Sequence, residues 1–258
     1  MAQQSDWARM RMSDFQTIDP MKSIAVLPTA AVEQHGPHLP VGTDLFIAEG
    51  LLEELRQQHA NTDLDLRILP VQAVGKSNEH LWASGTLTLS ATTALAAWTE
   101  IGLSVARAGI RKIAIVNAHG GNLDLISILA RELRVQANML ALKCQWGAFG
   151  APEGLYSAQE NTHGLHGGDF ETSLMLAFAP ETVDMTKAQD FRSSAEQSVL
   201  QPVGPVSYGW ISSDLNPQGT VGEAHLATAE KGRQTARHQA AGFLAALEKL
   251  REMPLPAR

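Results

Sequence analysis

The sequence predicts an α/β protein with a mainly parallel sheet covered by helices. Strand-like and helix-like runs alternate along most of the chain, and 44% of the 258 residues are apolar, which is enough to build a sizeable core. Such alternation favours parallel strands, because each helix carries the chain back to the same end of the sheet. We find no internal repeat or linker in the sequence, and we expect one domain over residues 1–258.

The predicted elements follow one another in a regular order. The strand-like runs are residues 24–32, 66–74, 113–117 and 139–146. The helix-like runs, in which apolar residues recur every three or four positions, are residues 45–57, 91–108, 123–138, 170–178 and 224–251. Pro180 ends the fourth of these helices. Between residues 191 and 222, a composition rich in Ser, Gln, Gly and Pro predicts loop or short strand.

Charge and composition favour a small polar substrate as the partner. The formal net charge is −7 and the isoelectric point is about 5.7, which argues against a nucleic-acid backbone or an anionic membrane. Residues 1–20 lack the apolar core of a secretory signal, and no apolar run approaches the ~18 residues that cross a bilayer. The single cysteine, Cys144, cannot form an internal disulfide. We therefore expect a cytoplasmic protein.

The densest chemical signal lies where the first strand-like run gives way to a helix. Glu33, His35, His38 and Asp44 are four potential metal ligands in one short stretch. Glu33 and His35 are two residues apart, so both side chains leave the same face if the strand persists through them. In open α/β sheets, this edge is where ligands bind.

Two members of this cluster have alternative interpretations. Asp44 falls in the first turn of the predicted helix, where a carboxylate can also act as an N-cap or offset the helix dipole. The nearby Glu33 and His35 favour a metal ligand instead. Four ligands from one short loop crowd a single ion, so His38 is either a ligand or a residue that supports one.

A second cluster, Asn-Ala-His-Gly-Gly-Asn at residues 117–122, again joins a strand to a helix. Its glycines suit a tight turn or a phosphate cradle, and Asn122 suits an N-cap. The spacing matches neither a dinucleotide-binding nor a P-loop fingerprint. A turn needs no imidazole, so His119 is either a metal ligand or a surface residue.

A third cluster contains His166 and Glu171, the candidate catalytic residues, just before a helix. Dipole compensation would also explain Glu171, which falls in the first helical turn, but His166 has no such structural reason. Three clusters of this kind supply ligands for two divalent ions, and we infer a dinuclear hydrolytic site. Carboxylates and imidazoles without thiolates favour Zn, Mn or Fe(II) with a position open to water, which suits amide hydrolysis.

A fourth polar segment, residues 75–88, contains Ser77 and His80. These two side chains either hydrogen-bond a polar substrate or belong to a plain strand connection. The tryptophans, Trp146 among them, either wall a pocket or fill the core. We take Ser77, His80, Asn122 and Trp146 as the candidate substrate contacts.

Taken together and in order, these segments resemble the creatininase (creatinine amidohydrolase) family. The matching motifs are Glu-x-His-Gly-x-His-Leu-Pro at residues 33–40 with Thr43-Asp44, His-Gly-Gly-Asn at 119–122, His-x5-Glu-Thr at 166–172, and the segments 75–87 and 219–232. The resemblance covers roughly residues 20–235, and its first motif is highly specific.

The resemblance implies a three-layer α/β/α fold with a mainly parallel central sheet, usually assembled as a hexamer. It also implies a two-metal centre that hydrolyses cyclic or linear amide bonds. Glu33, His35, Asp44 and His119 would be the metal ligands, with Asp44 bridging, and His166 would act as acid or base.

One departure from the family pattern affects the metals. True creatininases carry a glutamate ligand two residues after the histidine of the turn, where this chain has Gly121. One ion then loses a ligand unless Glu171 substitutes, so the resemblance implies one or two ions per chain and makes creatinine a less expected substrate. The Gly-Gly form resembles instead a deformylase of pyrimidine intermediates, a peptide-processing enzyme of mycofactocin synthesis and an inosose ring hydrolase.

The sequence leaves three functions open. The first is a metal-dependent amidohydrolase that cleaves a cyclic amide or formamide, with His166 protonating the leaving nitrogen. The second is a hydrolase that opens a cyclic keto-polyol or lactone, with Ser77, His80 and Asn122 contacting its hydroxyls. The third is a binding or scaffold protein without chemistry, for which Gly121 is the supporting observation.

Overall fold

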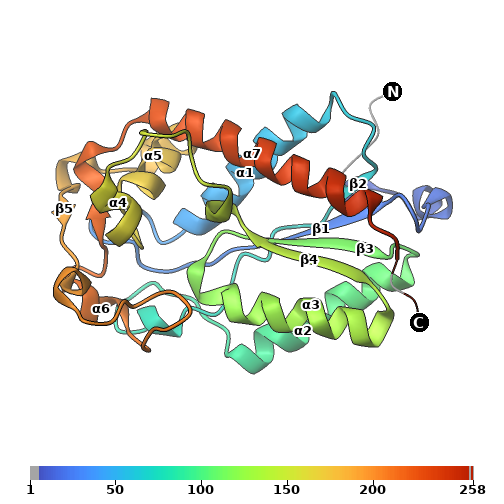
Figure 1. Ribbon diagram of the computed structural model, residues 1–258, viewed down its shortest axis with the longest axis horizontal. Coiled ribbons are helices and arrows are strands. Elements are labelled where there is room, and N and C mark those ends of the chain that lie inside the picture. Colours follow the sequence, from blue (N-terminus) through green and yellow to red (C-terminus); the bar gives the residue numbers. More distant parts are fainter. Residues whose placement is uncertain (1–5, 256, 258) are drawn as a thin grey trace.

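The computed structural model describes residues 6–255 and 257. At its centre lies a sheet of four parallel strands in the order β2-β1-β3-β4, between two layers of helices (Figure 1). The strands are β1 (Ile24–Thr29), β2 (Leu66–Ile68), β3 (Lys112–Asn117) and β4 (Leu140–Gln145). The expected three-layer α/β/α class is therefore confirmed.

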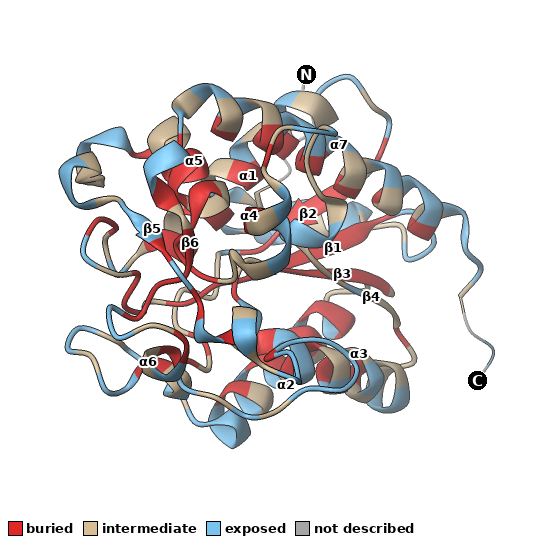
Figure 2. Cartoon of the chain, turned by 60° about the vertical axis from the view of Figure 1, so that its left-hand side comes forward, coloured by how far each residue is buried: buried red, intermediate tan, exposed pale blue. Residues whose placement is uncertain are grey.

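Two groups of helices cover the two faces of the sheet. On one face, α1 (Thr43–His59), α5 (Asp169–Phe178) and α7 (Ala229–Glu252) pack against one another, and on the other face α2 (Ala91–Arg107) packs against α3 (Leu123–Ala137). Figure 2 shows buried residues on the sides of these helices that face the sheet. Among the described residues, no helix is both long and apolar enough to span a membrane.

Each face of the sheet has its own apolar core. Leu51, Leu52 and Phe243 belong to the core under α1, α5 and α7, whereas Trp98 and Leu129 belong to the core under α2 and α3. Every residue of β1 and β3 is buried, because these strands are central and covered on both faces. This double burial explains why the sequence shows continuous apolar runs rather than alternation.

The observed elements differ from the predicted ones mainly at their ends. β1 ends at Thr29 and β2 at Ile68, earlier than predicted. Pro70, which has no N–H to offer a neighbouring strand, follows β2 closely. Residues 224–226 form a separate 3-10 turn, and α7 begins only after Thr228, whose hydroxyl accepts a hydrogen bond from the backbone of Lys231 at 3.2 Å.

The Gly- and Pro-rich region around residues 191–222 is mostly irregular, as predicted. It contains the four-residue helix α6 (Ser212–Leu215), and its ends pair as the short antiparallel strands β5 (Asp190–Phe191) and β6 (Gly222–Glu223). The helix α4 (Ala158–His163) was not predicted, because six mostly polar residues carry no clear periodicity. In Figure 1, α4, α6 and β5 gather beyond one end of the sheet.

The strand order places a topological switch point at that end of the sheet. From β1 the chain passes through α1 to β2 on one side, and through α2 it returns to β3 on the other side of β1. The connections that leave β1 and β3 therefore diverge, and a ligand can enter between them.

Candidate metal centre

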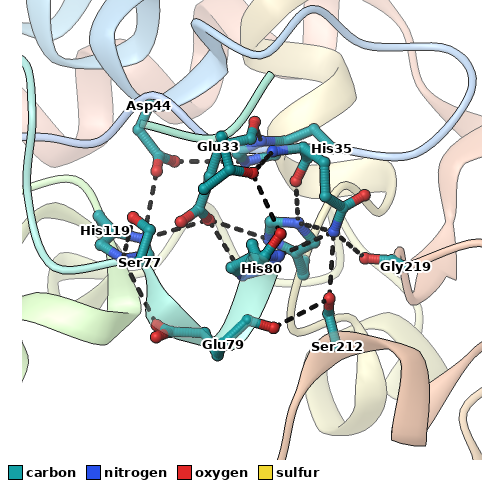
Figure 3. A network of polar contacts seen from close by, with 12 residues as sticks. Glu33, His35, Asp44, Ser77, Glu79, His80, His119, Ser212 and Gly219 are labelled. Carbon is teal, nitrogen blue, oxygen red and sulfur yellow. Dashed lines mark hydrogen bonds and ion pairs between the residues drawn. The ribbon is translucent and has the colours of Figure 1, made fainter. Parts of the chain in front are cut away.

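The three His/acid clusters of the sequence converge at this end of the sheet. The loop after β1 provides Glu33 and His35, the first turn of α1 provides Asp44, and the turn after β3 provides His119 (Figure 3). The remaining two, His166 and Glu171, lie before and within the first turn of α5, next to these residues.

Glu33 lies at the middle of the cluster and is 1% exposed. Its Oε1 atom is 3.2 Å from His119 Nδ1, 3.3 Å from His80 Nε2 and 3.6 Å from His166 Nδ1. The strand does not persist to this residue, so Glu33 and His35 do not share a strand face as expected. They reach the cluster from a loop, whose backbone is held by a hydrogen bond from Glu33 N–H to the carbonyl of Val41 at 2.8 Å.

Asp44 connects two imidazoles. Its Oδ1 is 3.4 Å from His35 Nε2, and its Oδ2 is 3.2 Å from His119 Nδ1. The N-cap of α1 is Gly42, and Asp44 makes no capping hydrogen bond. The alternative interpretation of Asp44 as an N-cap therefore fails, and its two oxygens are divided between two parts of the cluster.

Glu171 approaches the cluster from the opposite side. Its Oε2 atom is 3.7 Å from His35 Nε2 and accepts a hydrogen bond from the backbone of Gly167 at 2.7 Å. Burial raises the pKa of Glu171 to about 7, an effect that the neighbouring His35 only partly offsets. Position 171 thus supplies a carboxylate beside His35, as the resemblance required if Gly121 leaves a ligand missing.

Three imidazoles are oriented by backbone carbonyls. His35 Nδ1, His119 Nε2 and His166 Nε2 lie 3.0, 3.0 and 2.7 Å from the carbonyl oxygens of Glu33, Lys76 and Gln34. Each of these nitrogens must donate its proton to the carbonyl, so in a neutral ring the other nitrogen, which faces the carboxylates, is the one with a lone pair for a metal. A histidine that binds a metal commonly makes this arrangement with its second nitrogen.

Several buried atoms of the cluster have no hydrogen-bond partner. They are both carboxylate oxygens of Glu33, Nε2 of His35 and Oδ2 of Asp44. Burying ionised carboxylates without partners costs several kcal/mol, so the site requires a cation. Oxygen and imidazole ligands without sulfur suit Zn, Mn or Fe(II). The residues present therefore fit a divalent metal.

Three overlapping groups of side chains in the cluster could each hold an ion. The atoms of each group lie within 4.8 Å of one another, and the groups are Glu33 with His35 and Asp44, Glu33 with His80 and His166, and His35 with His166 and Glu171. The groups share members, as the ligands of a dinuclear site do, and the dinuclear site inferred from the sequence stays a prediction.

Electrostatics in the absence of metal favours protons at the places where cations would bind. Burial lowers the pKa of His35, but Asp44 and Glu171 outweigh this effect and raise the pKa to about 9. The pKa of His119 is raised well above its usual value because Glu33 and Asp44 overcome the burial effect. Asp44 in turn has a lowered pKa, since His35 and His119 outweigh its burial.

His38 stands outside the three groups of ligands. Its Nε2 is 2.9 Å from Thr172 Oγ1 and 3.0 Å from the carbonyl of Gly167, and burial lowers its pKa to about 4. A neutral His38 therefore donates to the backbone just ahead of α5. Of the two interpretations left open, the geometry favours the residue that supports ligands.

Two of the candidate substrate contacts, Ser77 and Asn122, are buried and make hydrogen bonds to protein groups behind the cluster. Ser77 Oγ lies 3.3 Å from His119 Nε2. The amide of Asn122 accepts from the backbone of Lys76 at 3.0 Å and donates to the carbonyl of Ala30 at 3.1 Å. Both side chains hold the turn of His119 in place, and neither makes a side-chain cap for α3.

Glu79 was not singled out by the sequence, yet it fills the space beside Gly121. A Cβ atom at position 121 would overlap Glu79 Oε1. Glu79 Oε1 is 3.6 Å from His119 Nε2, and its Oε2 is 2.7 Å from Lys76 Nζ. The carboxylate of Glu79 therefore faces the outer nitrogen of His119, away from the ion positions.

Trp146 borders a cavity of about 460 Å³ that reaches Glu171. The indole packs edge-on against Phe243 and is 2% exposed, so it belongs to the core as well. Its N–H has no hydrogen-bond partner. Both interpretations of this tryptophan therefore hold at once, since one side fills the core and another lines the cavity.

The remaining candidate, His80, lies beside Glu33 and His166 rather than at the cavity. Gln34, which the sequence analysis did not single out, connects it to the rest of the molecule through a 2.8 Å contact between Gln34 Nε2 and His80 Nδ1. Nothing in the residue type or spacing of Gln34 marks it, although it stands between two candidate ligands in the sequence.

Comparison with known proteins agrees with this geometry. The family model described as creatininase, creatinine amidohydrolase, matches residues 8–247. A mycofactocin precursor peptide peptidase of Mycobacterium ulcerans (strain Agy99) is 29% identical over 213 residues, which cover 81% of this chain and 78% of the relative. A creatinine amidohydrolase of Pseudomonas putida is 27% identical over 228 residues, which cover 81% and 82% of the two chains.

The solved structures agree on the fold. One named "Creatininase Mn" superposes with a TM-score of 0.77 over 96% of this chain and 99% of its own, at 21% identity. The structural match shows the shared α/β/α fold, and the family model spans most of the sequence. With its ligand clusters assembled at the sheet edge, the chain belongs to the creatininase family of metal-dependent hydrolases.

Proposed function

We propose that the chain hydrolyses a C–N amide bond, as a cyclic amide or formamide, in a small polar substrate. The observation that supports this most is the buried set of carboxylate oxygens and imidazole nitrogens without hydrogen-bond partners, which fits one or two divalent ions. Bound Zn, Mn or Fe would act as a Lewis acid and lower the pKa of a water molecule toward ~7. Two relatives with names that describe peptide and creatinine hydrolysis support the same bond type.

The metals would be held by Glu33, His35, Asp44, His119 and Glu171. Asp44 is suited to bridge because its oxygens face two different histidines, 3.4 and 3.2 Å away. Glu171 would add a carboxylate at another point of the cluster, beside His35, where its Oε2 is 3.7 Å from Nε2. The ligand set is thus complete without a side chain at position 121.

His166 is suited to move the proton of the reaction. Burial lowers its pKa well below the usual value, so the ring is neutral, and the hydrogen bond to the Gln34 carbonyl keeps its proton on Nε2. The lone pair on Nδ1 can therefore accept a proton inside the cluster and later return it to the leaving nitrogen. Glu171, with a pKa raised to about 7 in the absence of metal, can assist in the same place.

The substrate would lie in the cavity that connects Trp146 to Glu171. A volume of about 460 Å³ suits a small molecule or the end of a peptide. Gln145, Asn161 and Glu171 are among the polar residues that line this cavity, which fits a substrate that is polar at more than one position.

Metal content and turnover test the proposal together. Asp44→Asn preserves shape but removes the charge between His35 and His119, so we expect metal affinity to fall by more than about 100-fold, beyond the usual effect of residues behind the ligands. Glu49→Gln makes the matched change on an exposed position of α1 and should leave metal and turnover unchanged. Metal is measured by elemental analysis after dialysis.

The substrate class is tested with the reconstituted wild-type protein. Formamides, cyclic amides and inososes form the panel, and we expect turnover of the amides. Turnover confined to inososes would favour the ring-opening alternative. A wild-type protein that holds less than about one ion per chain, or an activity that survives chelation, would contradict the metal-dependent reaction.

A further inference from the structure

His80 differs from the other three imidazoles of the cluster in the hydrogen-bond partner that orients its ring. Together with Glu33 and His166 it could form an ion-binding group, and it is 2% exposed. The other three rings each donate a proton to a backbone carbonyl. His80 has no such carbonyl, and its Nδ1 instead lies 2.8 Å from the side-chain amide nitrogen of Gln34.

The orientation of the Gln34 amide is fixed by two backbone groups. Its Oε1 accepts a hydrogen bond from Gly36 N–H at 3.0 Å, and its Nε2 donates to the carbonyl of Gly219 at 2.7 Å. Turning the amide over would place oxygen against oxygen and one N–H against another. The group that faces His80 is therefore the NH2 group, which can only donate.

The proton of His80 must consequently be on its other nitrogen. A neutral imidazole carries one N–H, and because Nδ1 accepts from Gln34, the proton is on Nε2. That atom lies 3.3 Å from Glu33 Oε1, close enough for electrostatic attraction although the contact is not a hydrogen bond. A nitrogen that carries a proton has no lone pair for a metal, so the ring faces the cluster as a donor.

We propose that His80 is a positioning residue, whose Nε2–H orients the carboxylate of Glu33 for the metal, and that it is not itself a ligand. The inference rests on the proposed function only in that Glu33 binds a metal. It assigns a role to Gln34 as well, because the donor character of His80 depends on this amide. Carboxylates that bind metals are commonly oriented by polar groups that lie behind them.

The same contacts link the metal centre to the Gly- and Pro-rich region. Gly219 accepts from Gln34, and Ser212 Oγ in α6 lies 3.3 Å from Gln34 Nε2. Trp82 donates to the same hydroxyl at 2.7 Å. The position of this region therefore helps to set which nitrogen of His80 carries the proton.

Two nearly isosteric substitutions separate a donor from a ligand. His80→Gln keeps an N–H within reach of Glu33, so metal affinity should stay close to wild type. His80→Glu offers a carboxylate, which could replace a ligand but repels Glu33, and we expect affinity roughly 10- to 100-fold weaker. Affinity is measured by competition with a chromophoric chelator, using Zn and Mn separately, on variants whose circular dichroism matches wild type.

The opposite order would overturn the proposal. If His80 is a ligand, His80→Glu retains the ion and His80→Gln loses it. Loss of affinity in both variants with native circular dichroism would also contradict the positioning role, because the conservative donor should then have rescued binding. A wild-type protein without metal affinity would instead contradict the proposed function.

The tautomer of His80 can be read directly in the metal-free wild type. With histidine labelled by ¹⁵N, long-range ¹H–¹⁵N spectra at neutral pH distinguish a ring protonated at Nε2 from one protonated at Nδ1, and His80→Gln assigns the signal. We expect the Nε2–H form. An Nδ1–H form, or a doubly protonated ring, would overturn the inference whether or not the protein turns over any substrate.

Discussion

At the scale of single residues, the candidate metal centre holds protons at the positions proposed for metal ions. In the metal-free protein the carboxylates around His35 outweigh its burial and raise its pKa to about 9, and the pKa of His119 is also raised well above its usual value. Both rings therefore hold a proton at pH 7 on the nitrogens that face Asp44. A metal can bind these nitrogens only after the protons leave.

We therefore predict that metal binding at pH 7 releases protons and that affinity rises with pH. The expected number is about one proton for each raised histidine that becomes a ligand, because each pKa lies above the pH of the experiment. Titration calorimetry in buffers of different ionisation enthalpy measures the number. Binding without proton release at pH 7 would show that these histidines are not the ligands.

Some residues of this site can be singled out from the sequence alone, and others cannot. Glu33, His35 and His119 could be predicted because each sits where a strand-like run ends and no structural reason accounts for it. Gln34 and Glu79 could not, because their importance depends on contacts with distant residues, such as Gln34 with Gly219. The sequence pattern does not contain that distance information.

At the scale of elements, side chains and backbone from other segments pack closely against the turn between β3 and α3. A side chain at Gly121 would overlap Glu79 and come within 2.5 Å of His119 Nε2, whereas a Cβ at Gly120 would meet nothing within 4 Å. The absence of a side chain therefore matters at Gly121 but not at Gly120. Only Gly121 is required by close packing.

We predict that Gly121→Ala destabilises the protein by about 1–3 kcal/mol, the usual cost of overpacking, and weakens metal binding through His119. Gly120→Ala should be close to neutral or slightly stabilising, because it reduces the freedom of the unfolded chain without a clash. Urea unfolding and metal titration of both variants provide the measurements. Equal effects of the two substitutions would contradict the packing argument.

The lengths of elements show what local patterns miss. The apolar run at residues 24–32 predicts one strand, but residues 30–32 leave the sheet, and Val32 pairs instead with Leu87 in an isolated antiparallel bridge. An apolar run indicates that its residues are buried, and residues can be buried in a loop as well as in a strand. By contrast, α2 and α3 match their predicted ranges within a residue, because their periodicity extends over many turns.

At the scale of the whole molecule, the metal centre sets how stability depends on pH. In the metal-free protein, His35 has a pKa raised to about 9 from 6.5, so its stabilising contribution is complete below pH 6.5 and is lost as pH rises toward 9. His38 and His80, whose pKa values burial lowers to about 4 and about 3, contribute above pH 6.5 and lose this contribution in acid.

We predict that the metal-free protein loses stability on both sides of a maximum near neutral pH, and that metal removes most of the alkaline loss. A metal at about 100 times its dissociation constant adds about 2.7 kcal/mol, which raises Tm by roughly 5–10 °C in a protein of this size. Thermal unfolding from pH 5 to 9, with EDTA or with Zn, tests this. An identical alkaline decline in both conditions would contradict it.

The α/β class could be predicted from alternation alone, but the strand order could not. A strand that follows a helix can pair on either side of β1. The order β2-β1-β3-β4 goes together with the packing of α1, α5 and α7 on one face and of α2 and α3 on the other. The partition of apolar side chains between the two cores depends on that choice. The resemblance implied three layers, but it did not specify the strand order.

The wide spacing of the ligands along the chain has a consequence for biosynthesis. Glu33 leaves the ribosome 138 residues before Glu171, the carboxylate that lies beside His35. If these residues hold the metal as proposed, a nascent chain that ends before α5 lacks part of the binding site. Capture of the metal would then be a late step of maturation, open only to a chain that has folded through α5.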